Sequence, residues 1–257
     1  METRINLLPA DFTGSERLLL TFGDLRASTF RFNSGVAAVR LESGNGALVL
    51  LPYQGQQVWA AELGAPGVAQ RNLTMRSMVD EPQPTREFLH TFGGFLQHCG
   101  VTAVGNPSEE DRHPLHGELP NAPFRTAYLV SGEDEQGPYI GLGGTYRHTV
   151  AFLHNYLAEP RVRLHAGAAR FEVEINITNL KQSDMEVYYL AHVNFQPVDN
   201  SRLVYSAPST PEHVRVRATI PRQFQPAPGY EQFIHDLEEK PALHEVLRPD
   251  LVFNPEV

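Results

Sequence analysis

The chain has little cysteine and an uneven charge balance. Cys99 is its one cysteine in 257 residues, which excludes an internal disulfide and is compatible with a reducing compartment. Lys and Arg number 21 against 30 Asp and Glu, a formal net charge of −9. This acidic excess argues against nucleic acid or an anionic membrane as a partner, so we expect a neutral or weakly charged small-molecule ligand.

Long hydrophobic runs are also missing. No segment approaches the ~20 apolar residues that a bilayer-spanning helix needs. Glu2 and Asp11 place negative charge where a secretory signal peptide carries positive charge, and the apolar runs around them are short. We therefore expect a cytoplasmic protein with no membrane partner. The sequence leaves its oligomeric state open.

Few segments space their apolar residues as an amphipathic helix does, whereas alternation of apolar and polar residues is common. The fold class is therefore predicted as mainly β. In residues 170–179 (RFEVEINITN) apolar and polar residues alternate, as in a strand with one buried and one solvated face. Residues 35–43 and 47–53 read as two strands joined by a tight turn at Gly44-Asn45-Gly46.

Further strand candidates are punctuated by Gly and Pro, and they lie at residues 56–63, 126–132, 139–148, 185–195, 202–206 and 212–220. One helix is expected at residues 230–240, where Phe233, Ile234 and Leu237 have helical spacing. All-β domains often reach this length as one unit, so a single domain over residues 1–257 is predicted.

Residues 113–124 (HPLHGELPNAPF) place two imidazoles, His113 and His116, in a loop stiffened by proline and glycine. With His98 and Cys99 they offer good zinc ligands, but their spacing does not match known finger patterns. We therefore predict neither a metal site nor another cofactor. Cys99 is interpreted as inert packing rather than as a nucleophile.

A third imidazole, His192, lies in the strand-like stretch YYLAHVNFQP, with Asn194 two residues further on. A histidine in this setting can be oriented by hydrogen bonds and directed into a groove. The alternative is a core histidine that bonds a neighbouring carbonyl. One imidazole lies on a rigid loop and the other on a strand. We therefore keep a functional pair of histidines as an interpretation beside that of core histidines.

These stretches also carry a family resemblance. GGFLQHCGVTAVGNP, then HPLHGELPNAP, then YYLAHVNF resemble the aldose 1-epimerase (galactose mutarotase) superfamily, and most of all its branch of epimerase-like proteins of unassigned activity. The resemblance covers residues 93–197. His116 matches the leucine-histidine-glycine motif of that superfamily, and His192, 76 residues later, matches its second histidine motif.

The resemblance implies a galactose mutarotase-like β-supersandwich that binds a small-molecule sugar in a groove and needs no cofactor. It also implies aldose 1-epimerase-like chemistry, in which acid and base groups open the sugar ring so that the anomers interconvert. An imidazole has an unperturbed pKa near working pH, which suits this role. His192 would be the acid, and His116 would hydrogen-bond the ring oxygen or a neighbouring hydroxyl.

The candidate substrate contacts are Arg86, by analogy with an arginine of the mutarotases, and Gln97, Asn121 and Asn194, whose amides donate and accept at once. A solvated surface charge is the alternative for Arg86. Trp59 is interpreted as part of a buried strand and is left out of the site.

The family's catalytic glutamate, which comes from a late strand, has no counterpart in this sequence. Glu118 and Glu256 are available carboxylates, but neither lies in a matching motif. Apolar residues at 251–253 resemble the start of another strand, so we expect related chains to continue further. The alternatives to an epimerase are a sugar-binding or sensing protein on the same scaffold and, third, a purely structural β-domain.

Overall fold

The computed structural model describes residues 2–65, 67–220, 224–251 and 254–255. The chain forms two compact units, Met1–Pro197 and Val198–Val257. Each is described by itself. The single domain expected from the length stays a prediction.

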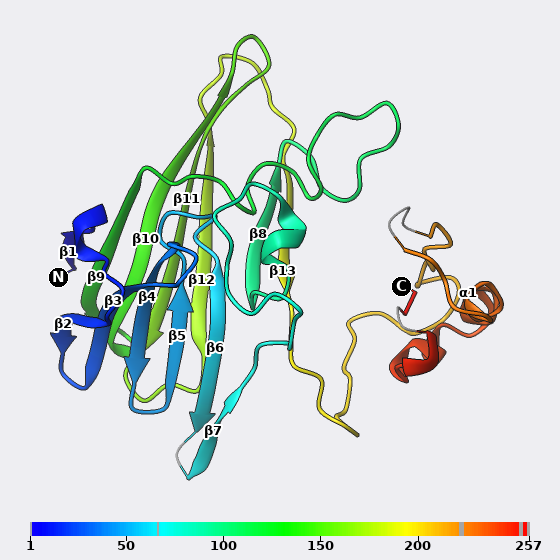
Figure 1. Ribbon diagram of the computed structural model, residues 1–257, viewed down its shortest axis with the longest axis horizontal. Coiled ribbons are helices and arrows are strands. Elements are labelled where there is room, and N and C mark those ends of the chain that lie inside the picture. Colours follow the sequence, from blue (N-terminus) through cyan, green and yellow to red (C-terminus); the bar gives the residue numbers. More distant parts are fainter. Residues whose placement is uncertain (1, 66, 221–223, 252–253, 256–257) are drawn as a thin grey trace. The chain divides into compact units, whose positions relative to one another are not determined.

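The first unit consists of two antiparallel sheets (Figure 1). The smaller sheet has the strand order β1 (Thr3–Asn6), β9 (Thr126–Asp134), β10 (Gly137–Val150), β11 (His154–His165) and β12 (Phe171–Asn179). The larger sheet has the order β13 (Tyr188–Val193), β8 (Leu96–Val101), β6 (Val58–Ala65), β5 (Gly46–Leu50), β4 (Ala37–Ser43), β3 (Leu25–Arg31) and β2 (Arg17–Phe22), with β7 (Val68–Asn72) paired to β6. The prediction of a mainly β protein is confirmed.

The core fills the space between the two sheets. Leu41 and Leu48 of the larger sheet and Leu129 and Leu142 of the smaller one are completely buried in one apolar cluster. Such side chains alternate with polar ones because successive strand residues point to opposite faces. Burial of this apolar surface is the main favourable contribution to stability.

The sequence patterns located β4, β5, β6, β9, β10, β12 and β13, but not the other described strands. The predicted turn at Gly44-Asn45 joins β4 to β5, where Ser43 pairs with Gly46. The stretch 170–179 forms β12, and its apolar side chains are half-buried because β12 is the last strand of its sheet. Trp59 is buried on β6, as expected.

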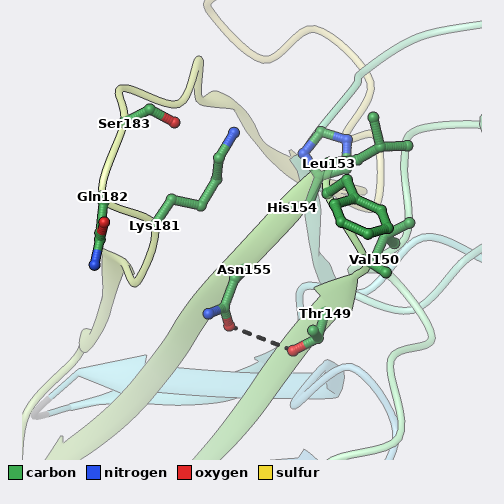
Figure 2. Close-up of a pocket in the computed structure, with 10 residues that line it drawn as sticks. Thr149, Val150, Leu153, His154, Asn155, Lys181, Gln182 and Ser183 are labelled. Carbon is green, nitrogen blue, oxygen red and sulfur yellow. Dashed lines mark hydrogen bonds between the residues drawn. The ribbon is translucent and has the colours of Figure 1, made fainter.

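Strands β10 and β11 form a long hairpin whose tip, residues 151–153, carries apolar side chains (Figure 2). Phe152 is fully exposed and has a φ of 67°. Below the tip, the Thr149 hydroxyl donates to Asn155 Oδ1 at 3.3 Å. The turn after β12, at residues 181–183, lies beside this tip.

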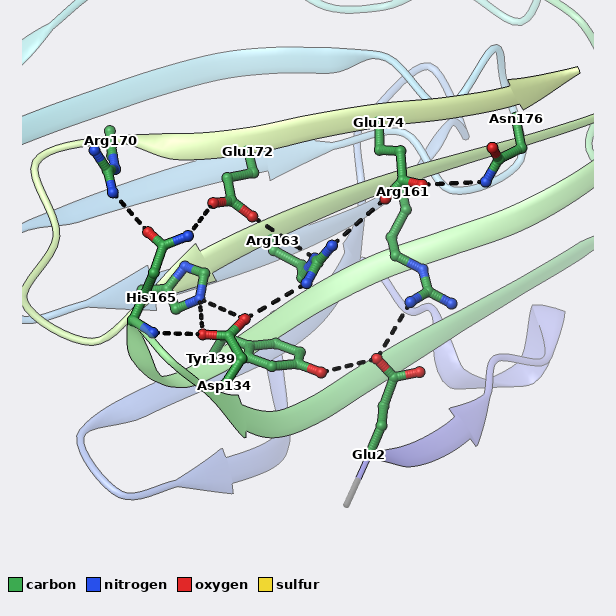
Figure 3. A network of polar contacts seen from close by, with 11 residues as sticks. Glu2, Asp134, Tyr139, Arg161, Arg163, His165, Arg170, Glu172, Glu174 and Asn176 are labelled. Atoms are coloured by element: carbon green, nitrogen blue, oxygen red, sulfur yellow. Dashed lines mark hydrogen bonds and ion pairs between the residues drawn. The ribbon is translucent and has the colours of Figure 1, made fainter.

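The outer face of the smaller sheet carries a network of charged and polar side chains (Figure 3). Arg163 lies between three carboxylates, with nitrogen–oxygen distances of 3.5 Å to Asp134, 3.8 Å to Glu172 and 3.4 Å to Glu174. His165 Nε2 lies 3.0 Å from Asp134 Oδ1. Arg163 and its carboxylate partners are partly exposed, whereas His165 is buried; each exposed pair therefore contributes little alone, and the network keeps this face solvated.

The second unit contains the helix α1 (Tyr230–Glu239), which confirms the helix predicted at 230–240. Its apolar face is formed by Phe233, Ile234 and Leu237, all of which are buried. None of the helices described is both long and apolar enough to cross a membrane.

The strands predicted at 202–206 and 212–220 are wrong. Both stretches are described and neither forms a strand; Leu203 and Val204 are largely exposed. Alternation alone does not make a strand, because the backbone also needs a partner for its hydrogen bonds. Of the strand expected at 251–253, Leu251 lies in a 3-10 turn, and residues 252 and 253 are outside the described residues.

Candidate functional site

The imidazole rings of His116 and His192 meet although 76 residues separate them in the sequence. Their centroids lie 5.3 Å apart, with an interplanar angle of 75°. His192 lies on β13 opposite Gln97 of β8, on the face that points away from Leu96 and the core between the sheets. Both imidazoles are half-buried, so two titratable rings share one partly shielded environment.

Two phenylalanines form an aromatic wall around the imidazoles. Phe88, in the 3-10 turn Phe88–Thr91, has its ring centroid 4.6 Å from that of His116 and 5.4 Å from that of His192. The ring of Phe92 lies edge-on to His192 at 6.1 Å. The 3-10 turn belongs to the excursion of residues 73–95 between β7 and β8. Edge-to-face contacts of this kind restrict ring orientation and exclude water from one side.

The backbone holds His116 in a left-handed conformation, with a φ of 61°. Its N–H donates to the Gly105 carbonyl at 3.0 Å, and its carbonyl accepts from Gly100 N–H at 2.9 Å. At the next residue, Gly117, a Cβ would lie 2.4 Å from the carbonyl oxygens of Gly100 and Ala103. The motif therefore needs glycine after the histidine because the chain passes directly over the end of β8.

Glu118 fastens the same loop to both sheets. Its carboxylate accepts hydrogen bonds from Val101 N–H at 3.0 Å, Thr102 N–H at 3.2 Å and the Thr102 hydroxyl at 2.5 Å, all next to the end of β8. From β11 it accepts the Tyr156 hydroxyl at 2.5 Å. Burial, followed by the Glu118 charge, raises the pKa of Tyr156, so Tyr156 stays a neutral donor.

A second polar group lies next to Glu118 on β10. The Tyr146 hydroxyl and His148 Nδ1 are 3.0 Å apart, and the His148 ring lies 5.3 Å from that of Tyr156. Burial lowers the pKa of His148, with Glu118 opposing the shift and His154 and Arg86 adding to it. Burial also raises the pKa of Tyr146, against the smaller effects of the Arg86 charge and of an Arg86 hydrogen bond. Both groups are therefore neutral near pH 7.

The predicted substrate contacts lie around these rings in different settings. Arg86 is exposed, two residues before Phe88, and its Nη1 donates to the Asn121 carbonyl at 3.4 Å. The Asn121 amide is buried and bonds Gln57 Nε2 at 2.8 Å and the Thr91 hydroxyl at 2.9 Å.

The other two predicted amides are also buried. Gln97 is completely buried and donates to the Thr91 carbonyl at 3.0 Å. Asn194 donates to the Gly94 carbonyl at 2.8 Å. The amides of Gln97, Asn121 and Asn194 therefore bond protein groups that hold the 73–95 excursion, and contact with a sugar stays a prediction for each of them.

The residues considered for a metal lie on different faces. His98 is completely buried, and its Nδ1 lies 2.7 Å from the Tyr189 hydroxyl; burial lowers its pKa to about 4. Cys99 follows on the opposite face of β8, and burial raises its pKa to about 12. His113 Nδ1 lies 2.8 Å from the Pro114 carbonyl. Among the residues described, no group of three His, Cys, Asp or Glu could hold a metal ion.

Sequence reasoning missed the aromatic neighbours of the histidines, Phe88 and Phe92, and the polar group next to Glu118, which consists of Tyr146, His148 and Tyr156. A signal for three of them was present. Tyr146 and His148, like His154 and Tyr156, are two residues apart and therefore share a strand face. Such pairs on adjacent strands indicate a polar cluster, and here Tyr146 and Tyr156 are buried in an apolar cluster with Leu119 and Phe124.

Comparison with solved structures identifies the class of fold. The chain resembles the crystal structure of a putative aldose 1-epimerase from Klebsiella pneumoniae subsp. pneumoniae MGH 78578, with a TM-score of 0.62 at 16% sequence identity. The match covers 76% of this chain and 56% of that one. The fold is therefore the galactose mutarotase-like β-supersandwich, as the sequence motifs implied.

The family follows from a match to residues 33–234, over most of the chain. The chain belongs to the family described as "Domain of unknown function (DUF4432)". A comparison with curated proteins finds no match.

Proposed function

We propose that this protein is an aldose 1-epimerase-like isomerase that interconverts the anomers of a small sugar at His116 and His192. The observation that carries the proposal is the 5.3 Å separation of the two imidazole rings, beside the aromatic wall of Phe88 and Phe92. The fold, shared with a structure described as a putative aldose 1-epimerase, supports it.

In the proposed reaction His192 donates a proton to the ring oxygen as the bond from C1 to that oxygen breaks. His116 hydrogen-bonds the ring oxygen or a neighbouring hydroxyl and polarises it. The proton of the anomeric hydroxyl leaves at the same time, which gives the open-chain aldehyde. Rotation about the bond from C1 to C2 and the reverse proton transfers then close the other anomer, and no atom is gained or lost.

The base that takes the anomeric proton decides how fast the reaction is. Glu118 is two residues from His116, but its carboxylate already accepts four hydrogen bonds. In the proposed reaction water or a buffer base therefore takes this proton, and we expect the rate to rise with the concentration of buffer base.

The occupied carboxylate of Glu118 also favours a second candidate function, a protein that binds or senses a sugar on this scaffold without turning it over. Both functions place the sugar at His116 and His192, and they differ in anomer exchange.

Saturation-transfer NMR on a panel of aldoses separates them. We expect exchange between the anomers above background, reduced about 10²- to 10⁴-fold in His192→Ala. His235→Ala is the matched control, because His235 is an exposed residue of α1. Binding without exchange would establish the second function, and unaltered exchange in a folded His192→Ala protein would remove His192 from the mechanism.

A further inference from the structure

A pocket of about 440 Å³ lies between the tip of the β10–β11 hairpin and the turn that follows β12 (Figure 2). The hairpin contributes residues 149–155 and the turn contributes residues 181–183. This volume is large enough for a small charged group and the atoms of the ligand that are bonded to it. Neither the resemblance nor the proposed reaction assigns a role to it.

The pocket carries positive charge without a matching carboxylate. Lys181 extends from the turn towards the hairpin and towards the ring of His154 (Figure 2). None of the lining residues is acidic, and none of the described carboxylates forms an ion pair with Lys181. His154 Nδ1 is buried and has no hydrogen-bond partner among the described residues. The Lys181 ammonium group favours an anionic ligand, and His154 Nδ1 can donate to the same ligand in the tautomer that carries its proton there.

Ser183 lines the same pocket, as does Thr149, whose hydroxyl already donates to Asn155 Oδ1. The Ser183 hydroxyl and the Lys181 ammonium group are donors that suit the several oxygens of a phosphate or a carboxylate. The net charge of −9 belongs to the chain as a whole. The electrostatic potential at a bound group depends mainly on the charges within about 10 Å, because salt screens more distant charges.

Contacting side chains connect this pocket to Glu118. The ring of His154 lies 6.1 Å from that of His148, which lies 5.3 Å from that of Tyr156. Tyr156 donates to Glu118, which is two residues after His116. The pocket therefore adjoins the polar group behind the site.

We propose that the pocket at Lys181 and His154 binds an anionic group, a phosphate or carboxylate carried by a sugar. That the rest of the ligand is a sugar depends on the proposed function, whereas the anion subsite depends only on the pocket. A phosphorylated or acidic sugar would bind more tightly than its neutral parent, because Lys181 gains a partner only with the former.

The chain has only two lysines, Lys181 and Lys240, which allows a direct test. Reductive methylation with ¹³C-formaldehyde keeps the charge of each lysine and gives each a separate NMR signal. We expect glucose 6-phosphate or glucuronate to shift the Lys181 signal saturably, and glucose at the same concentration to leave it in place. The Lys240 signal should not move, and it reports that the protein stays folded.

The matched variants are Lys181→Gln and Lys240→Gln. We expect Lys181→Gln to weaken binding of the charged sugar at least about tenfold and Lys240→Gln to leave it unchanged. A shift with glucose 6-phosphate alone or with glucuronate alone identifies which anion the pocket takes. Equal affinity for charged and neutral sugars, or no effect of Lys181→Gln, would overturn the subsite.

The test of the anion subsite and the test of the proposed function can fail independently. Anomer exchange on neutral aldoses with an unresponsive Lys181 would leave the isomerase and remove the subsite. A responsive Lys181 without exchange on any sugar, charged or neutral, would retain the subsite and remove the isomerase.

Discussion

The Tyr156 hydroxyl donates to the Glu118 carboxylate at 2.5 Å and so joins β11 of the smaller sheet to the loop that carries His116. Glu118 also accepts from Val101 N–H, Thr102 N–H and the Thr102 hydroxyl. We interpret Glu118 as a positioning residue that fixes the loop between the two sheets.

Glu118→Gln should lower the free energy of unfolding by about 2–3 kcal/mol, because an amide nitrogen would face donors that now have an acceptor. Tyr156→Phe is the milder control, since it removes one bond and leaves three, and it should cost about 1 kcal/mol. Urea unfolding measures both. Equal stability of Glu118→Gln and the parent protein would contradict the positioning role.

Gly117→Ala tests how closely the loop approaches β8. The new Cβ would lie 2.4 Å from two backbone oxygens at a φ of 83°. Gly105→Ala is the matched control, with a φ of 86° and no atom within 4 Å of the new Cβ. Both substitutions incur the left-handed strain of roughly 1–2 kcal/mol. The Gly117 variant should lose roughly a further 1–3 kcal/mol through overpacking.

Thermal or urea unfolding of the two glycine variants gives this difference directly. Anomer exchange measured on the same samples should fall in Gly117→Ala more than in Gly105→Ala, because the substitution moves His116. Equal losses of stability in the two variants would show that the contact over β8 is loose.

His98 should make stability depend on pH. Its folded pKa of about 4 lies below the ordinary 6.5, so the fold favours the neutral ring. The contribution of the neutral His98 ring to the free energy of unfolding is complete above pH 6.5. It is lost as the pH falls towards 4, and the total loss is about 3 kcal/mol. Urea unfolding at pH 5 and pH 8 should therefore show a flatter pH dependence in His98→Gln. If the free energy of unfolding changes equally with pH in the parent protein and in His98→Gln, the pH dependence comes from other groups.

Cys99 should be unreactive in the folded protein. It is completely buried, and its raised pKa of about 12 keeps the thiol protonated at pH 8. We expect alkylation by iodoacetamide to be at least about 1000-fold slower than in urea-unfolded protein. Because the chain has one cysteine, mass spectrometry reads the result without ambiguity. Rapid labelling of the folded protein would mean that β8 opens readily.

The sequence by itself determined about half of the described strands, the helix α1 and the two motif histidines, but not β8 or β11. Alternation in residues 170–179 and the turn at Gly44-Asn45 are local patterns, and the motif around His116 gave both the superfamily and the glycine at position 117. The same alternation failed at 202–206 and 212–220, where no strand supplies hydrogen-bond partners.

Only the tertiary structure decided which side chains lie beside those histidines and Glu118. Phe88 comes from the excursion of residues 73–95, whereas Tyr146 and Tyr156 come from two neighbouring strands of the smaller sheet, and no local pattern relates them to His116. Strand register sets such contacts, and a shift of one residue would turn every side chain to the opposite face. The pocket at Lys181 has the same origin, because it forms where a hairpin tip and a distant turn lie side by side.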